Sequence, residues 1–149
     1  MRDIQEIIIH CSESPHGRGD NAKTIDRWHK ERGFKSIGTD GKVYHIGYHY
    51  VILEDGTRES GRPESMVGAH CKGHNSKSLG ICLIGIDSFT EEQFDSLARL
   101  IKELMLKYDL THKQVRGHYN YSESKTCPNF GVAQFMYERV INQEQAIEG

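Results

Sequence analysis

The chain has neither a surplus of basic residues nor a long hydrophobic segment. Its 149 residues include 19 Lys and Arg against 21 Asp and Glu, so the formal net charge is −2 at pH 7. Because nucleic-acid binding depends on a basic field that neutralises phosphates, we expect no nucleic-acid partner. The apolar run 7–9 is too short for a signal peptide or a membrane span. We therefore expect a protein that is cytoplasmic as synthesised and is not inserted in a membrane.

The sequence also lacks internal repeats, low-complexity tracts and linker-like segments. A chain of this length can bury one hydrophobic core without covalent staples. We expect residues 1–149 to form a single domain, with a frayed tail from about residue 144. We expect the protein to be a monomer.

None of the four cysteines belongs to a closely spaced C-x-x-C pair, which is typical of structural zinc sites. Two disulfides are possible in principle. Without a secretory signal, however, free thiols are the expected state. Cys71 and Cys82 are expected to be structural, and Cys127 is a candidate ligand because it shares an irregular loop with a histidine.

Apolar runs separated by polar or glycine-containing turns predict the β-strands. Short runs rich in isoleucine, valine and leucine cover residues 4–10, 48–53 and 79–85, and each is typical of a buried strand. After a turn at 54–57, residues 58–61 are expected to return antiparallel to the second of these strands.

Capping residues and apolar periodicity predict the helices. The first helix is expected to follow Thr24 as N-cap and to end before Gly33. The longest helix opens with the capping box 90–93, and its apolar residues recur at i, i+3, i+4 and i+7, as expected of a stripe packed on a core. A terminal helix is expected around residues 135–141.

One loop contains both a histidine and a cysteine, His118 and Cys127, with Lys125 two residues before the cysteine. Imidazole and thiolate are favoured ligands of zinc, and a catalytic zinc takes three protein ligands and keeps a fourth position open. His10 is the leading candidate for the third ligand, because open α/β sheets place their sites beyond the carboxyl ends of strands. The alternative is that Cys127 is a small buried residue and His118 a hydrogen-bonding residue of the loop.

A series of short segments occurs in one order between the first predicted strand and Pro128. They are Ile9-His10-Cys11-Ser12, Gly47-Tyr48-His49-Tyr50, Asp55-Gly56-Thr57, Gly61-Arg62, Val67-Gly68-Ala69-His70, Gly73-His74-Asn75, Leu79-Gly80-Ile81-Cys82-Leu83, Arg116-Gly117-His118 and Lys125-Thr126-Cys127-Pro128. In this order the sequence resembles the type-2 N-acetylmuramoyl-L-alanine amidases, the family that includes phage T7-type lysozyme and the peptidoglycan recognition proteins.

The resemblance implies that His10, His118 and Cys127 bind one zinc ion (Zn²⁺) and that Tyr48 and Lys125 are catalytic. It implies a single α/β domain in which a central mixed β-sheet is flanked by α-helices and the zinc lies in a surface cleft. The family hydrolyses the amide between N-acetylmuramic acid and the L-alanine of the stem peptide. The expected substrate is therefore peptidoglycan, and the expected protein is a phage- or prophage-type lysin that acts on the cell wall after release.

The residue types suit that chemistry. The phenolic hydroxyl of Tyr48 and the ammonium of Lys125 can stabilise a tetrahedral intermediate. His70 and Asn75 are expected to line the cleft and bind substrate, and His49 to fill the core or to orient a ligand. Ordinary structural or surface roles are expected for the remaining histidines that we considered: His16, His29, His45 and His112.

Two other functions are compatible with the same residues. A module that binds peptidoglycan without cleaving it is one, although non-catalytic members of the family commonly lack the cysteine ligand. A cysteine peptidase with Cys127 as nucleophile is the other, and it predicts activity that survives chelation. Two departures from the T7-type pattern, a slightly longer step from His118 to Cys127 and an extra turn at 36–45, are expected to alter substrate preference more than metal binding.

Overall fold

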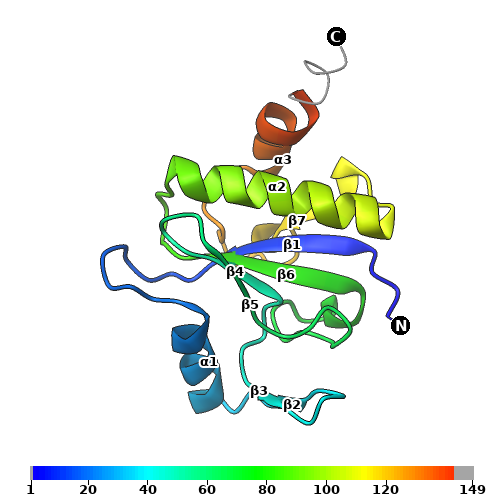
Figure 1. Ribbon diagram of the computed structural model, residues 1–149. Helices are drawn as coiled ribbons and strands as arrows, with labels where there is room; N and C mark the ends of the chain where they lie inside the picture. Colours follow the sequence, from blue (N-terminus) through cyan, green and yellow to red (C-terminus); the bar gives the residue numbers. More distant parts are fainter. Residues whose placement is uncertain (1, 143–149) are drawn as a thin grey trace.

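The structure, a computed structural model, describes residues 2–142, so the tail predicted from about residue 144 lies outside the described residues. Within that range a mixed sheet of five strands forms the centre of the fold (Figure 1), in the order β5-β4-β6-β1-β7. The strands are β1 (Glu6–Cys11), β4 (Tyr50–Ile52), β5 (Arg58–Ser60), β6 (Ser78–Leu83) and β7 (Val115–Gly117). The predicted α/β fold with a central mixed sheet is confirmed.

The parallel pair β1 and β6 forms the middle of the sheet. β1 is also parallel to β7, while β4 is parallel to β6 and antiparallel to β5. β6 is buried throughout and β1 from Ile7 onward, as expected for strands that are covered on both faces. At the end of the pair, His10 stands opposite Cys82. β1 therefore places His10 at the C-terminal edge of the sheet.

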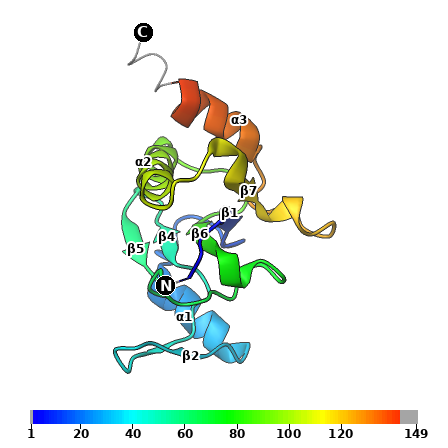
Figure 2. The ribbon, with the colours of Figure 1, turned by 90° about the vertical axis from the view of Figure 1, so that its right-hand side faces the viewer.

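Helices cover both faces of the sheet (Figures 1 and 2). α2 (Glu91–Tyr108) and α3 (Val132–Met136), which continues as a π-helical turn over Tyr137–Ile141, lie on one face, and α1 (Ala22–Glu31) lies on the other. The larger core, under α2 and α3, includes Ile7, Ile9, Leu79, Ile81, Leu97, Ile101, Val132 and Val140. A smaller cluster beside α1 contains Ile25, Ile46, Val51, Cys82 and Ile84. Among the described residues, no helix combines the length and apolarity that a bilayer crossing requires.

Both of the longer helices begin with a reciprocal capping box. At α2 the predicted box is confirmed, since Gln93 N–H donates to Thr90 Oγ1 at 3.1 Å and Thr90 N–H to Gln93 Oε1 at 3.0 Å. At α1 the prediction of Thr24 as N-cap is wrong. Asn21 is the N-cap, and Thr24 is the third helical residue, whose hydroxyl accepts from Asn21 N–H at 3.1 Å. The helix ends before Gly33, as predicted.

The predicted strands exist, with boundaries shifted by a few residues. Segments 4–10, 48–53 and 79–85 correspond to β1, β4 and β6, and 58–61 corresponds to β5, which is antiparallel to β4 as expected. The predicted terminal helix corresponds to α3 and its π-helical continuation. We did not predict β7, because three residues carry too little periodicity to indicate a strand.

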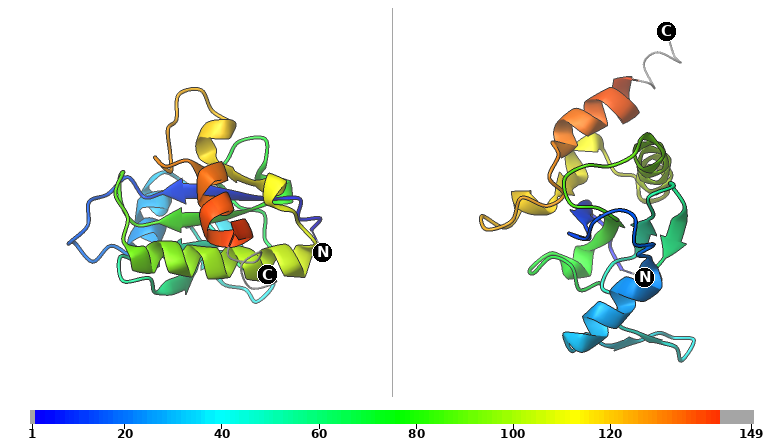
Figure 3. Two further views of the ribbon diagram at one scale, coloured as in Figure 1. Left: turned by 90° about the horizontal axis from the view of Figure 1, so that it is seen from above. Right: turned by 90° about the vertical axis from the view of Figure 1, so that its left-hand side faces the viewer.

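Residues 36–45, predicted to form an extra turn, are a small antiparallel hairpin. β2 (Ser36–Ile37) pairs with β3 (Val43–Tyr44), and Gly41 N–H closes the turn by donating to Gly38 O at 3.0 Å. The hairpin projects beside α1, away from the central sheet (Figures 2 and 3). It follows Phe34, one of the residues that line the cleft described below.

Candidate metal centre and cleft

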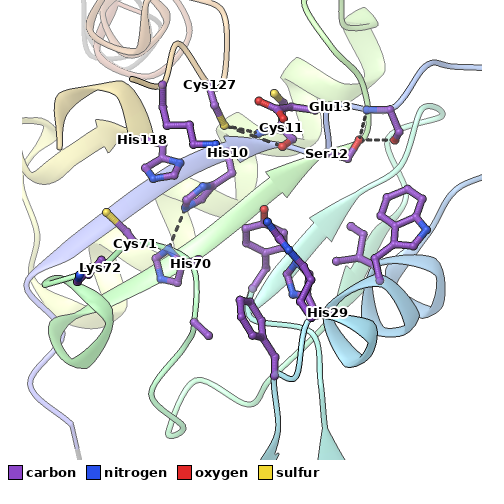
Figure 4. A pocket seen from close by; sticks show the side chains of 18 of the residues that line it. His10, Cys11, Ser12, Glu13, His29, His70, Cys71, Lys72, His118 and Cys127 are labelled. Atoms are coloured by element: carbon purple, nitrogen blue, oxygen red, sulfur yellow. Dashed lines mark hydrogen bonds between the residues drawn. The ribbon is translucent and has the colours of Figure 1, made fainter. Parts of the chain in front are cut away.

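A cavity of about 810 Å³ lies where the central strands end, beside α1 (Figure 4). Its lining comes from residues 10–18, from α1 and Arg32 after it, from Phe34 and Tyr48, and from the loops 69–75 and 118–127. All of the predicted site residues line it: His10, Tyr48, His70, Asn75, His118, Lys125 and Cys127. The fold thus collects in one cleft residues that are widely separated in the sequence.

His10, His118 and Cys127 form a compact group of potential metal ligands. One nitrogen from each ring and the cysteine sulfur all lie within 4.8 Å of one another. The two imidazole centroids are 4.6 Å apart. Tetrahedral zinc with bonds of about 2.0–2.3 Å needs its ligand atoms about 3.5 Å apart, so only a small contraction separates this group from a zinc site.

The strand end of β1 fixes the environment of His10. The side chain is buried, and burial together with the neighbouring His70 and His118 holds its pKa well below the ordinary value. Burial and the nearby Lys125 also lower the pKa of His118. Both imidazoles are therefore neutral near pH 7, which is the form that binds a metal.

His70 links His10 to the start of β6. His10 Nε2 lies 2.8 Å from His70 Nδ1, and His70 Nε2 lies 3.2 Å from Ser78 Oγ. The first contact is drawn in Figure 4. Asn75 Oδ1 accepts from the backbone N–H groups of His70 and Cys71, at 2.8 and 2.9 Å. His70 and Asn75, predicted to bind substrate, therefore already use side-chain polar atoms in contacts within the chain.

Cys127 is buried against the end of β1, with 4% of its surface exposed. Its sulfur accepts from Cys11 N–H at 3.0 Å, a donor that favours a thiolate. The hydrogen bond with the Cys11 thiol and burial both raise the pKa of Cys127. The sulfur thus needs an adjacent cation to ionise near neutral pH. Sequence reasoning missed Cys11 as a neighbour, although it directly follows His10 in the chain.

Tyr48 lies between His10 and α1. Its ring centroid is 5.0 Å from that of His10 and 5.4 Å from that of His29. Burial raises the pKa of Tyr48 well above its ordinary value, so the phenol is protonated at neutral pH. His29 is fixed by Gly47 N–H, which donates to its Nδ1 at 2.8 Å, and burial with Arg32 and Arg62 lowers its pKa to about 4.

One face of α1 lines the cleft, although we predicted no site residue there. The lining residues are Ile25, Trp28, His29 and the C-cap Arg32, at i, i+3, i+4 and i+7. That spacing places side chains on one helical face and could have identified this wall from the sequence. From the sequence these residues indicated only a helix, and we therefore expected an ordinary role for His29.

The accessible rim of the cleft carries more positive than negative charge. Lys125 is exposed on the loop between His118 and Cys127. The other basic lining residues are Arg18, Arg32 and Lys72, and Glu13 is the acidic one. Such a rim attracts ligands that carry carboxylates.

His49 lies in the core rather than in the cleft lining. Its Nδ1 accepts from Gly80 N–H at 3.0 Å, so Nε2 carries the proton and donates to Met66 O at 2.8 Å. The ring supports His70 from behind, with centroids 5.9 Å apart. This placement agrees with the core role expected for His49.

The comparisons with known proteins all identify amidases or endolysins as similar proteins. A family model described as N-acetylmuramoyl-L-alanine amidase matches residues 1–130. The endolysin of Escherichia phage T7 is 37% identical over 134 residues, covering 85% of this chain and 81% of its own. The endolysin of Enterobacteria phage T3 is 36% identical, covering 86% and 82%. The solved amidase LysC from Clostridium intestinale URNW superposes with a TM-score of 0.77 at 30% identity, covering 92% of this chain and 85% of that one.

Proposed function

The chain belongs to the N-acetylmuramoyl-L-alanine amidase family, and on that basis we propose that it is a zinc-dependent lysin of phage or prophage type. The reaction is hydrolysis of the amide between N-acetylmuramic acid and the L-alanine of the peptidoglycan stem peptide. The family match, the endolysin relatives and the amidase structure support a peptidoglycan amidase, as the motif resemblance implies. One observation carries the zinc dependence: the ligand atoms of His10, His118 and Cys127 converge in the cleft.

The donor set fits zinc. Two neutral imidazoles and one cysteine thiolate are ligand types that zinc prefers, and three ligands leave one position for a reactant. The backbone N–H of Cys11 stabilises the thiolate form of Cys127. When bound, zinc supplies Lewis-acid polarisation of the scissile carbonyl and makes water acidic enough to react near neutral pH.

Tyr48 and Lys125 supply the proposed catalytic groups of the chain. Tyr48, protonated and beside His10, hydrogen-bonds the attacking water and carries a proton toward the leaving amine. Lys125 stabilises the negative charge that develops on the carbonyl oxygen of the tetrahedral intermediate. The two groups reach the reacting amide from different walls of the cleft.

The wall formed by 69–75 is proposed to bind the substrate. His70 and Asn75 line it, and Lys72 adds positive charge at its edge. The stem peptide carries carboxylates, which the basic rim attracts. We propose that the protein acts on the cell wall as a monomer after its release from the cytoplasm.

The alternative functions are less consistent with the site. A cysteine peptidase needs a reactive thiol, but Cys127 is 4% exposed and its hydrogen bond with the Cys11 thiol and its burial raise its pKa. A module that only binds peptidoglycan does not require three converging potential metal ligands beside a half-buried tyrosine.

A chelation assay on purified peptidoglycan tests the proposal. The protein is stripped with a chelator, assayed, reloaded with zinc and assayed again for stem peptides with a free L-alanine amino terminus. We expect release to stop on stripping and to return with zinc. Binding without release under any condition would leave only the recognition module, and release that ignores chelation would refute the zinc dependence.

A further inference from the structure

We propose that His70 is a positioning residue that acts through His10, holding the His10 ring in the tautomer and orientation needed for metal binding. This inference rests on the proposed function, because it concerns one of the proposed zinc ligands. It assigns His70 a role in assembling the metal centre, in addition to its place in the proposed substrate-binding wall. The three side chains that carry it are His10, His70 and Ser78, which form a chain of short polar contacts.

The contacts decide which His10 nitrogen faces the metal. His10 Nε2 already lies 2.8 Å from His70 Nδ1, so Nδ1 is the nitrogen left for a cation. A nitrogen that binds a metal carries no proton, and the proton of the neutral ring must then be on Nε2. His10 Nε2–H donates to His70 Nδ1, and His70 Nε2–H donates to Ser78 Oγ at 3.2 Å. The series of hydrogen bonds thus runs from His10, the proposed ligand, through His70 to Ser78 in β6.

The ring of His70 occupies a slot made by two glycines. A Cβ on Gly80 would lie 2.7 Å from His70 Cγ, and a Cβ on Gly68 would lie 2.7 Å from His70 Cδ2. Real side chains do not approach so closely, so the ring position depends on the absence of side chains at both residues. Asn75 Oδ1 fixes the backbone of the same segment by accepting from His70 N–H at 2.8 Å.

A residue held in this way can orient its partner. Histidine ligands of metals generally donate the second ring N–H to an acceptor, which fixes the tautomer and raises ligand basicity. His70 Nδ1 is that acceptor for His10, which leaves the proton of His70 on Nε2, where it faces the Ser78 hydroxyl. Since both nitrogens of His70 have partners within the chain, donation to a substrate would require breaking one of these contacts.

The test compares two substitutions that remove the same ring but leave different polar atoms. In His70→Asn the side-chain oxygen stands near the position of Nδ1 and can still accept from His10. In His70→Gln the amide stands near the position of Nε2 and lies beyond the reach of His10. Zinc affinity is measured by competition with a chromogenic chelator, and the His10 tautomer in the zinc-loaded protein by long-range proton–nitrogen NMR. His112→Ala, at an exposed histidine outside the cleft, is the control.

We expect His70→Gln to bind zinc about 10- to 100-fold more weakly than the wild type, and His70→Asn to lose only a few-fold. The wild-type His10 should show a proton on Nε2. Equal zinc affinity in all variants, or a His10 proton on Nδ1 with zinc bound, overturns the inference. A rise in KM with unchanged zinc affinity in every variant would place His70 on the substrate instead. A wild-type chain that binds no zinc overturns the proposed function itself, and that outcome is distinct from a zinc-binding wild type with indifferent variants.

Discussion

The two sides of the cleft are built differently. On one side, His10 and His70 stand on or beside the buried strands β1 and β6, and each ring contacts another ring or strand residue. On the other, residues 118–127 contain one short 3-10 turn and a series of turns, and Lys125 is exposed. A buried strand can hold a ligand within a narrow range of positions, whereas a loop can present a charge that adjusts to substrate.

Contacts at both ends of β1 attach the loop 118–127 to the sheet. At the C-terminal end, Cys11 N–H donates to Cys127 Sγ at 3.0 Å. At the N-terminal end, Glu6 accepts from the Tyr121 hydroxyl at 2.8 Å and contacts His74 Nδ1 at 2.9 Å. The rings of His74 and Tyr121 stack 3.8 Å apart. The loop therefore depends on the strand for its position, and variants can separate the two contributions.

Removing Cys127, the proposed ligand contributed by the loop, should have the largest effect. We expect Cys127→Ala to lose stoichiometric zinc and to lower turnover by on the order of 10³-fold or more, because the proposed metal centre no longer forms. Metal content by atomic absorption and peptide release give the two measurements. Cys71→Ala, at another buried cysteine, is the control and should keep its zinc. Normal zinc content in Cys127→Ala would contradict the ligand assignment.

Removing the phenol beside His10 should separate chemistry from metal binding. We expect Tyr48→Phe to keep its zinc and its fold while kcat falls by about 10²-fold or more, the usual contribution of a proton-transferring group. Tyr44→Phe, at the hairpin, serves as the matched control. Full activity in Tyr48→Phe would show that the proposed role is wrong.

Substitution of Lys125 tests the loop side of the cleft without removing a proposed metal ligand. We expect Lys125→Met to lower kcat by about 10²-fold, as loss of one stabilising group for the oxyanion does, and Lys125→Arg to recover part of the loss. Zinc content should be unchanged in both. Lys113→Met, at an exposed lysine outside the cleft, should behave like the wild type. An effect of Lys125→Met on zinc content alone would assign the lysine to loop structure.

Removing the hydrogen bond between Tyr121 of the loop and Glu6 of β1 should lower the stability of the fold. We expect Tyr121→Phe to lower the free energy of unfolding by about 1–2 kcal/mol, because it deletes a hydrogen bond to a charged group. Denaturant titration measures this, with the exposed Tyr137→Phe as control. Burial and Glu6 raise the pKa of Tyr121 to about 12.

The hydrogen bond between Tyr121 and Glu6 also predicts a pH dependence of stability. Since the folded pKa of Tyr121 exceeds the unfolded value of about 10, the hydroxyl contributes its full stability below pH 10. That contribution is lost as the pH rises toward 12. The difference between the wild type and Tyr121→Phe should therefore shrink over this interval, and a constant difference would speak against the Glu6 contact.

The smallest expected effect is an increase in the free energy of unfolding. Glu13 has φ 57°, a left-handed conformation that costs an L residue about 1–2 kcal/mol. We expect Glu13→Gly to raise the free energy of unfolding by about 0.5–1 kcal/mol, after the greater chain entropy of glycine is subtracted. Thermal or denaturant unfolding measures the gain. Glu123→Gly, in the loop of Lys125, should give no such increase.

Much of the cleft lining could be predicted from particular residues. His10, His118 and Cys127 are the residue types that bind zinc, and the short segments around them carry the family resemblance. That resemblance also indicated Tyr48 and Lys125, which line the same cavity. The wall formed by α1 was missed, although its spacing was present, because each of its residues also has an ordinary helical role. The N-cap was misassigned because Asn21 and Thr24 are both good capping residues.

The sequence by itself determined the α/β class, the order of the elements and the chemical types of the proposed ligands, because periodicity and side-chain chemistry are local properties. Only the tertiary structure decided that His70 contacts His10 and Ser78, that Glu6 fastens the loop of Tyr121, and that Cys11 contacts Cys127. Apart from the contact of His70 with Ser78, these contacts join residues far apart in the chain. Their distances follow from how strands and loops pack, and no local pattern specifies them.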